Sequence, residues 1–132
     1  VVQFGLANEL AERLLTDYRS GFPQACMLFP DAVQTLAALR ASGYRLGLIT
    51  NGSARMQRRK LECLALQPAF DVILISEVEG VSKPDPEIFR RALDRLHVDA
   101  HLAVFVGDHF LAVVGGGARS VPCAALRRHG KF

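Results

Sequence analysis

Short, continuous apolar runs bounded by turn signals are the feature that most restricts what this chain can fold into. They are typical of buried strands, and they fall at residues 44–49, 72–75, 102–106 and 121–126. Segments with helical periodicity separate them, at residues 53–65, at residues 85–96 and in a third segment that ends near residue 118. Apolar strands that alternate with helices form parallel sheets covered on both faces. The sequence therefore predicts an α/β fold with a doubly wound parallel sheet.

The amino-terminal part reads differently, because it has helical periodicity and no strand. Its apolar residues recur at helical spacing over residues 3–19, which predicts an amphipathic helix. Gly21 and Pro23 interrupt this pattern, so we expect a loop from there to Pro30. Pro30 suits the first turn of a second helix, which Gly43 ends.

Composition sets the class of protein within which these elements are interpreted. The chain has 132 residues, of which 50% are hydrophobic, enough for one domain with its own core. No apolar run reaches the roughly 18 residues of a membrane span, so no membrane partner is expected. The three cysteines are far apart and lack zinc spacing, which favours reduced thiols and a cytoplasmic location.

The charge balance argues only weakly for an anionic ligand. The net charge is +3, and the basic residues are scattered over several predicted elements. The densest cluster, residues 55–60, lies in a predicted helix and has no interleaved aromatic residue. A solvated helix face explains this cluster better than a nucleic-acid site, because single-stranded nucleic acid is bound by aromatic stacking as well as charge. We expect no nucleic-acid partner.

Polar residues directly after the predicted strands are the first candidates for chemistry, since ligands of such sheets bind beyond the carboxyl ends of the strands. Thr50, Asn51 and Gly52 follow the first strand at the start of a helix. Backbone N–H groups there, together with the Thr50 hydroxyl, suit an anion such as phosphate. The alternative is that Asn51 or Ser53 merely caps the helix.

Two further candidates stand in rigid or strand-end positions. Lys83 is followed by two prolines in the segment KPDP, which would hold its ammonium where it can neutralise a phosphoryl group. Asp85 is better explained as the cap of the next helix. Asp108 follows a strand and a glycine, so its carboxylate can bind Mg²⁺, although capping the next helix is the competing role. His109 beside it is more simply incidental.

Taken together and in this order, these segments resemble the haloacid dehalogenase (HAD) superfamily. The matching stretches are LITNGS around Thr50, GVSKPDPEIF around Lys83 and VFVGDH around Asp108, within residues 28–118. The resemblance implies that Thr50 and Lys83 are catalytic, that Thr50, Asn51, Gly52 and Lys83 contact the substrate phosphate, and that Asp108 binds Mg²⁺. The KPDP element resembles the subgroup with a helical cap. Residues 1–27 would then be a remnant of that cap, and residues 28–132 the HAD-like core.

The chain departs from the family pattern at two places. The family's first motif is an apolar strand ending in DxDxT, and neither Asp17 nor Asp31 follows a predicted strand. The nucleophilic aspartate is therefore missing, together with the central strand between those that end at Thr50 and Asp108, and the core is expected to be incomplete. In the fourth motif, Val113 stands near where a second acid is common, which weakens the Mg²⁺ site.

The resemblance implies a Mg²⁺-dependent phosphatase that acts on a small phosphorylated metabolite through an aspartyl-phosphate in the intact protein. The chain alone is expected to be an inactive fragment. The alternative is a non-catalytic HAD-like scaffold that binds an anion or a protein partner. Dehalogenase chemistry, in which the same aspartate attacks carbon, also stays open. A Rossmann dinucleotide site is not favoured, because Gly115, Gly116 and Gly117 do not form GxGxxG. Substrate identity and oligomeric state cannot be read from the sequence.

Overall fold

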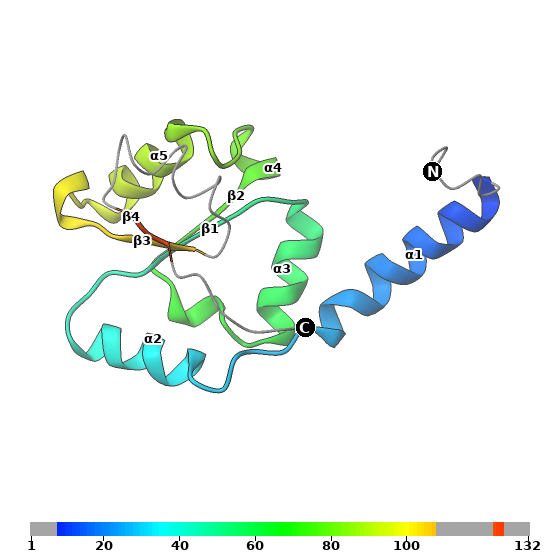
Figure 1. Ribbon diagram of the computed structural model, residues 1–132, viewed down its shortest axis with the longest axis horizontal. Helices are drawn as coiled ribbons and strands as arrows, with labels where there is room; N and C mark the ends of the chain where they lie inside the picture. Colours follow the sequence, from blue (N-terminus) through cyan, green and yellow to red (C-terminus); the bar gives the residue numbers. More distant parts are fainter. Residues whose placement is uncertain (1–7, 108–122, 126–132) are drawn as a thin grey trace.

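The computed structural model describes residues 8–107 and 123–125, which form helices and short strands in alternation (Figure 1). The elements are α1 (Asn8–Ala25), α2 (Ala32–Ala41), β1 (Gly47–Thr50), α3 (Ala54–Cys63), the 3-10 turn η2 (Gln67–Ala69), β2 (Val72–Ile75), α4 (Ser76–Glu79), α5 (Pro86–Leu96), the 3-10 turn η3 (Ala100–Leu102), β3 (Phe105–Gly107) and β4 (Cys123–Ala125). The predicted α/β class is confirmed.

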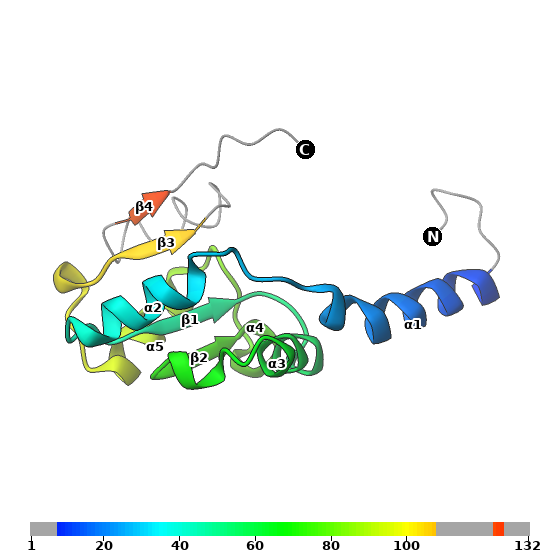
Figure 2. The ribbon, with the colours of Figure 1, turned by 90° about the horizontal axis from the view of Figure 1, so that it is seen from below.

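The described strands pair in parallel, as their apolar character predicts. β1 pairs with β2 in a register that places Gly47 opposite Val72 and Thr50 opposite Ile75, and β3 pairs with β4. These are two separate two-stranded sheets, since no described strand joins β1 to β3 (Figure 2). The described strands are thus not joined between the strand that ends at Thr50 and the strand that leads to Asp108; that a central strand is missing there, as the family resemblance implies, stays a prediction.

The core lies between the β1–β2 sheet and α5. Asp85 caps α5 by accepting a hydrogen bond from the Glu87 N–H, Pro86 occupies the first turn, and the predicted helix over residues 85–96 is confirmed. The buried side chains of this core are Ile49, Leu74, Ile88, Phe89 and Ala92. The Phe89 ring contacts Phe105 of β3 edge-on, with ring centroids 4.9 Å apart. Helix α5 therefore packs against both sheets.

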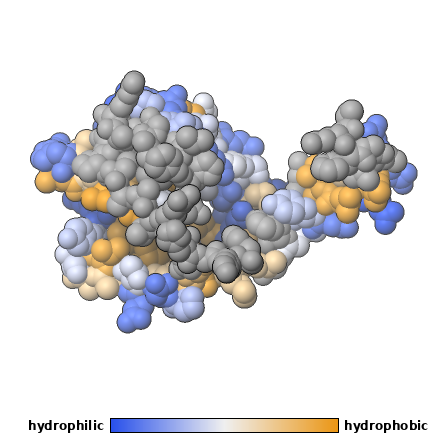
Figure 3. All heavy atoms as spheres, in the orientation of Figure 1, coloured by the Kyte–Doolittle hydropathy of each residue, from blue (hydrophilic) through white to orange (hydrophobic). Residues whose placement is uncertain are grey.

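The amino-terminal helices contribute little to that core. Helix α1 extends away from the sheets, and its main contact with the other described elements is with α3 (Figures 1 and 2). Helix α2 buries no side chain completely. Apolar side chains consequently stay exposed on α1 and near α2, where Figure 3 shows them at the surface. No described helix has both the length and the apolar character needed to cross a membrane.

Several predicted boundaries are wrong. Helix α1 continues to Ala25 through Gly21 and Pro23. A helical glycine costs about 1 kcal/mol and a proline removes one hydrogen bond, so these residues weaken a helix without necessarily ending it. Pro30 precedes α2 instead of lying in its first turn. The first and third strands begin later than predicted, at Gly47 and Phe105. The helix predicted to end near residue 118 lies outside the described residues.

Candidate active site

The carboxyl ends of β1 and β2 meet at one edge of their sheet, and the candidate site lies there. Thr50 and Ile75 are paired at this edge, so the loops that follow the two strands emerge side by side. One loop carries Asn51 and Gly52, and the other leads through α4 to Lys83. Parallel pairing thus brings the first two predicted phosphate-binding segments together.

Lys83 reaches back onto the end of β1. Its Nζ donates a hydrogen bond of 2.9 Å to the Ile49 carbonyl oxygen. The Leu46 carbonyl points toward β2, because it accepts hydrogen bonds from the Asp71 and Val72 N–H groups. Successive carbonyls along a strand point to opposite sides, so the Ile49 carbonyl, three residues later, points away from β2. The ammonium therefore lies at the edge of β1 that faces away from β2, 5.5 Å from the centroid of the Phe105 ring.

Asn51 connects the same two segments through the backbone of Lys83. Its Oδ1 accepts from the Lys83 N–H at 2.9 Å, and its Nδ2 donates to the Lys83 carbonyl at 2.9 Å. The following peptide bond, between Lys83 and Pro84, is cis. The Asn51 carbonyl in turn accepts from Gln57 Nε2 at 3.2 Å. The Asn51 side chain thus holds Lys83 across 32 positions of sequence.

Thr50 is the last residue of β1 and is partly buried. Its hydroxyl makes no hydrogen bond with any residue that the structure describes, so it can donate one to a bound oxygen. Its neighbour along the strand, Ile49, carries the carbonyl that holds the Lys83 ammonium. The structure therefore places the two predicted catalytic residues, Thr50 and Lys83, at the same strand end.

The amino terminus of α3 is occupied by side chains of this chain. Ser53 Oγ accepts from the Met56 N–H at 3.3 Å, which is the capping role considered for Ser53. Glu77 Oε2 accepts from the Ala54 N–H at 2.8 Å, and Ser76 Oγ accepts from the Gly52 N–H at 3.0 Å. An anion that used the Gly52 N–H would have to displace the Ser76 hydroxyl. The assignment of Gly52 to the substrate stays a prediction.

Gly52 has a second, structural reason to be glycine. Its φ is +136°, in a region that residues with a Cβ rarely adopt. A Cβ at this position would also lie 2.7 Å from Gln57 Nε2. The turn after β1 therefore requires glycine whether or not the residue binds a ligand.

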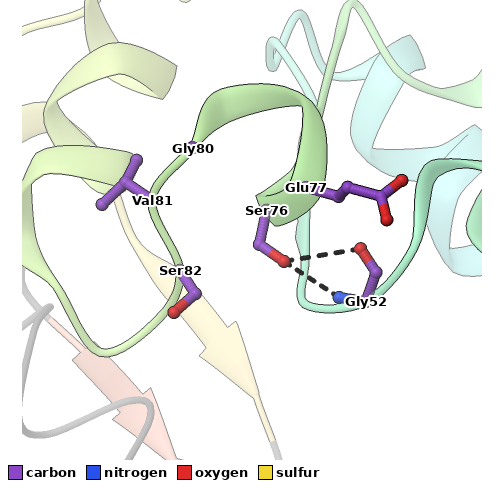
Figure 4. A pocket seen from close by; sticks show the side chains of 6 residues that line it. All are labelled: Gly52, Ser76, Glu77, Gly80, Val81 and Ser82. Atoms are coloured by element: carbon purple, nitrogen blue, oxygen red, sulfur yellow. Dashed lines mark hydrogen bonds between the residues drawn. The ribbon is translucent and has the colours of Figure 1, made fainter.

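A solvent-open pocket of about 390 Å³ lies beside these loops (Figure 4). It is lined by Gly52, Ser76, Glu77, Gly80, Val81 and Ser82. Figure 4 shows Ser76 and Glu77 on the Gly52 side, with Val81 and Ser82 on the other. The Glu77 carboxylate disfavours a phosphate within the pocket itself, since like charges repel. Phosphate binding at Thr50 and Lys83, which do not line this pocket, stays a prediction.

Ser76 and Glu77 are site residues that the sequence prediction missed. They follow β2 directly, so the rule that selected Thr50, the search for polar residues at the carboxyl ends of strands, would have found them. They form the start of α4, a helix of four residues that is too short to show a periodic pattern.

The loop before Lys83 is anchored by an ion-pair cluster. Glu79, at the end of α4, accepts from Arg95 at 2.6 and 2.8 Å, and its side chain is 6% exposed. Arg91 donates to the Glu79 carbonyl at 2.7 Å. Hydrogen bonds from Arg95, and then the charges of Arg95 and Arg91, lower the pKa of Glu79 against the opposing effect of burial. The cluster fixes α4 against α5 and so sets where the Lys83 loop begins.

The remaining predicted residues lie elsewhere or outside the described part of the chain. Asp108, the predicted Mg²⁺ ligand, is not among the described residues, and neither are His109 and Val113. Residues 8–107 and 123–125 contain no group of three or more His, Cys, Asp or Glu that could hold a metal ion. Asp17 lies within α1 and Asp31 directly precedes α2, so neither follows a strand, as predicted.

Comparison with known proteins agrees with this geometry. A family model described as haloacid dehalogenase-like hydrolase matches residues 6–118. A glyceraldehyde 3-phosphate phosphatase from Pyrococcus abyssi is 42% identical over 87 residues, which are 66% of this chain and 37% of that protein. An (S)-2-haloacid dehalogenase from Pseudomonas sp. is 32% identical over 130 residues, 97% of this chain and 55% of that protein.

A solved structure agrees as well. The HAD-hydrolase YfnB from Bacillus subtilis, described as bound to magnesium, superposes with a TM-score of 0.79 at 26% identity, over 92% of this chain and 54% of that one. This chain spans about half, or less, of the length of the proteins it matches. Motifs, fold and comparisons agree, and the chain belongs to the haloacid dehalogenase-like hydrolases.

Proposed function

We propose that this chain is part of a HAD-type phosphatase that hydrolyses a small phosphorylated metabolite. The observation that carries the proposal is the position of Lys83, whose ammonium hydrogen-bonds to Ile49 next to Thr50. A hydroxyl donor and a fixed cation at the carboxyl end of a parallel strand are suited to a phosphoryl group. The phosphatase from Pyrococcus abyssi among the relatives supports the same substrate class.

The two residues have complementary roles. The Thr50 hydroxyl donates a hydrogen bond to a phosphoryl oxygen and orients the group. Lys83 offsets negative charge on the phosphoryl group and on the attacking oxygen. An ammonium and an anionic oxygen about 4 Å apart attract by roughly 4 kcal/mol at an effective dielectric constant near 20. Electrostatic stabilisation of this kind is the main work of a protein in phosphoryl transfer.

The attacking group is the part of the mechanism that these residues do not supply. The family resemblance implies an aspartate that attacks phosphorus and forms an aspartyl-phosphate, with departure of the alcohol after protonation. Asp17 and Asp31 are not positioned for this role, because neither follows a strand. We therefore expect the 132 residues alone to be inactive. The alternative proposal is a non-catalytic scaffold that binds an anion or a protein partner through the same residues.

Magnesium is proposed as the cofactor of the intact protein. Asp108 would supply a carboxylate ligand, and the ion would offset negative charge on the phosphoryl oxygens. Asp108 lies outside the described residues, so the proposal depends on its place in the sequence directly after β3. The magnesium-bound HAD structure that this chain resembles supports the choice of metal. Val113 near the second acidic position argues for weak binding in this chain.

Dehalogenation is the second candidate activity. It is favoured by the (S)-2-haloacid dehalogenase that aligns with nearly the whole chain. A carboxylate nucleophile would attack carbon in place of phosphorus, and Lys83 would again offset negative charge. The phosphatase relative has the higher identity, so phosphatase activity is placed first.

The remaining expectations concern location and partners. Arg55, Arg58 and Arg59 are exposed on α3, whose ten residues include no aromatic ring, which supports a solvated face and not a nucleic-acid site. We propose a cytoplasmic protein without a membrane partner. The division into a cap remnant at residues 1–27 and a core from residue 28 is also proposed, and it is supported by the way α1 extends away from the sheets.

Hydrolysis of p-nitrophenyl phosphate with Mg²⁺, measured on the protein as the cell makes it, tests the activity. We expect hydrolysis that Lys83→Ala and the isosteric Thr50→Val each reduce by about 100-fold or more, as loss of an electrostatic catalytic group does. Chloride release from 2-chloropropionate, measured in parallel, tests dehalogenation. Full phosphatase activity in Lys83→Ala would contradict the proposed role of the lysine, and a protein inactive in both assays would favour the scaffold alternative.

A further inference from the structure

Asn51 is placed differently from the substrate ligand that its sequence position predicts. Its side-chain amide has one acceptor and one donor group, and both are used by the backbone of Lys83, at 2.9 Å each. An amide can accept from the N–H and donate to the C=O of one residue through two separate atoms, whereas an ionised carboxylate has no donor. The acceptor and donor of the Asn51 amide thus match the N–H and C=O of Lys83, which indicates a specific contact.

Lys83 is consequently held at both ends, by the end of β1 and by the residue that follows it. Asn51 fixes its backbone, and the Ile49 carbonyl, two positions earlier, receives its ammonium. The Phe105 ring lies against the ammonium on the β3 side. A lysine side chain has a large rotamer entropy, of about 2 kcal/mol, that must be lost when it stabilises a transition state. Contacts that order the residue beforehand reduce that loss at the moment of reaction.

The loop that carries Asn51 is itself fixed. Gln57 of α3 donates to the Asn51 carbonyl, and Ser76 holds the Gly52 backbone through its N–H and carbonyl. The hydrogen bonds thus run from α3 and α4 through Asn51 to Lys83. None of them requires a bound ligand.

We propose that Asn51 is a positioning residue, whose amide holds Lys83 in place for phosphate binding, and that it is not itself the main phosphate contact. The functional part of this inference, the effect on phosphate binding, rests on the proposed function, in which Lys83 binds the phosphate. Its geometric part, the contact between Asn51 and Lys83, can be tested without any ligand.

The first experiment measures the contact. Hydrogen exchange of the Lys83 amide, followed by NMR, should accelerate by about tenfold in Asn51→Ala, the upper range for loss of one hydrogen bond. Gln34→Ala, which removes an exposed amide from α2, should leave the rate unchanged. In the unsubstituted chain, a scalar coupling across the hydrogen bond should join the Lys83 N–H to the Asn51 side-chain carbonyl carbon. This second measurement serves if the variant fails to fold. Unchanged exchange, or absence of the coupling, would overturn the proposal.

The second experiment separates positioning from direct contact. Inorganic phosphate affinity is measured by titration for the unsubstituted chain, Asn51→Ala, Lys83→Ala and the double variant. If Asn51 acts through Lys83, Asn51→Ala weakens binding by about tenfold in the unsubstituted background but by less than about twofold once Lys83 is absent. An equal weakening in both backgrounds would mean that Asn51 contacts phosphate directly and would overturn the proposal. If the unsubstituted chain binds no phosphate, the proposed phosphate site fails, while the exchange experiment still decides the positioning contact.

Discussion

Two parts of the molecule differ in how well their apolar side chains are covered. The packed half, defined here as β1, β2, α3 and α5, holds all the buried apolar side chains of the described residues. The open half, defined as α1, α2, β3 and the segment joining α1 to α2, keeps apolar residues in solvent, with Val106 of β3 at 55% exposure. Buried apolar area is the dominant stabilising contribution to folding. Stability should therefore be concentrated in the packed half, which also carries Thr50, while Lys83 lies in the loop that leads into α5.

The difference also bears on the prediction that a central strand is missing from this sheet. The expected place of that strand is between β1 and β3, and Val106 of β3 is exposed. Apolar side chains that a complete sheet would cover are expected to stay exposed when a strand between two others is lacking. In the packed half, β1 pairs with β2 and α5 covers them, so their apolar side chains are buried.

The largest expected difference between the two halves is tested by removing a phenylalanine side chain from each of them. Phe89→Ala deletes a ring that is 1% exposed, and it should lower the free energy of unfolding by about 3–5 kcal/mol. Phe29→Ala deletes a ring that is 58% exposed in the segment before α2, and it should cost no more than about 1 kcal/mol. Urea unfolding followed by circular dichroism measures both. Equal losses would mean that the open half is as well packed as the other.

A smaller effect is expected from the backbone of the site loop. Gly52→Ala combines a φ of +136° with a contact at 2.7 Å to Gln57 Nε2, and should destabilise the fold by about 1–3 kcal/mol. Gly43→Ala, in the turn after α2, is the matched control, since Gly43 has a φ of +83° but nothing within 4 Å of the added Cβ. It should cost about 1 kcal/mol, from the backbone alone.

The same unfolding assay can separate the two contributions to the Gly52 effect. In a Gln57→Ala background the contact is absent and the backbone strain remains. The destabilisation caused by Gly52→Ala should then fall to about that caused by Gly43→Ala. A Gly52→Ala loss no larger than that of Gly43→Ala would show that the Gln57 contact is readily relieved.

The smallest effect depends on pH and concerns the ion pairs that join α4 to α5. The folded-state pKa of Glu79 lies below its ordinary value of 4.5, because Arg95 and Arg91 favour the carboxylate. Ionised Glu79 therefore stabilises the fold above about pH 4.5, and this contribution disappears as the pH falls through the lowered pKa. Glu79→Gln should cost on the order of 1 kcal/mol at pH 7, since exposed arginine groups are partly screened by water.

The control for this prediction is Glu62→Gln, which changes an exposed glutamate on α3. Chemical denaturation at several pH values should show the gap between the unsubstituted chain and Glu79→Gln narrowing toward pH 3, whereas Glu62→Gln should show no comparable change. A gap that stays constant with pH would argue against a charge effect at Glu79.

Local sequence patterns determined a large part of this structure. The apolar runs predicted parallel strands, and β2 occurs at the predicted residues. The sequence Asp85-Pro86 predicted the start of α5, because an aspartate cap and a proline in the first turn are short-range features. Thr50 and Lys83 were selected because polar residues after parallel strands converge at one edge. The family resemblance added their roles and the expected interruption of the sheet.

Only the tertiary structure decided how the side chains at that edge are used. The phosphate-binding roles suggested for Asn51 and Gly52 stay predictions, and the structure adds that the Asn51 amide holds Lys83 and that the Gly52 N–H donates to Ser76. The contacts of Asn51 with Lys83 and of Gly52 with Ser76 join residues 32 and 24 positions apart. Periodicity and capping rules describe neighbours within a few residues and say nothing about which distant donor and acceptor meet. That choice depends on strand register and loop geometry, which exist only once the chain has folded.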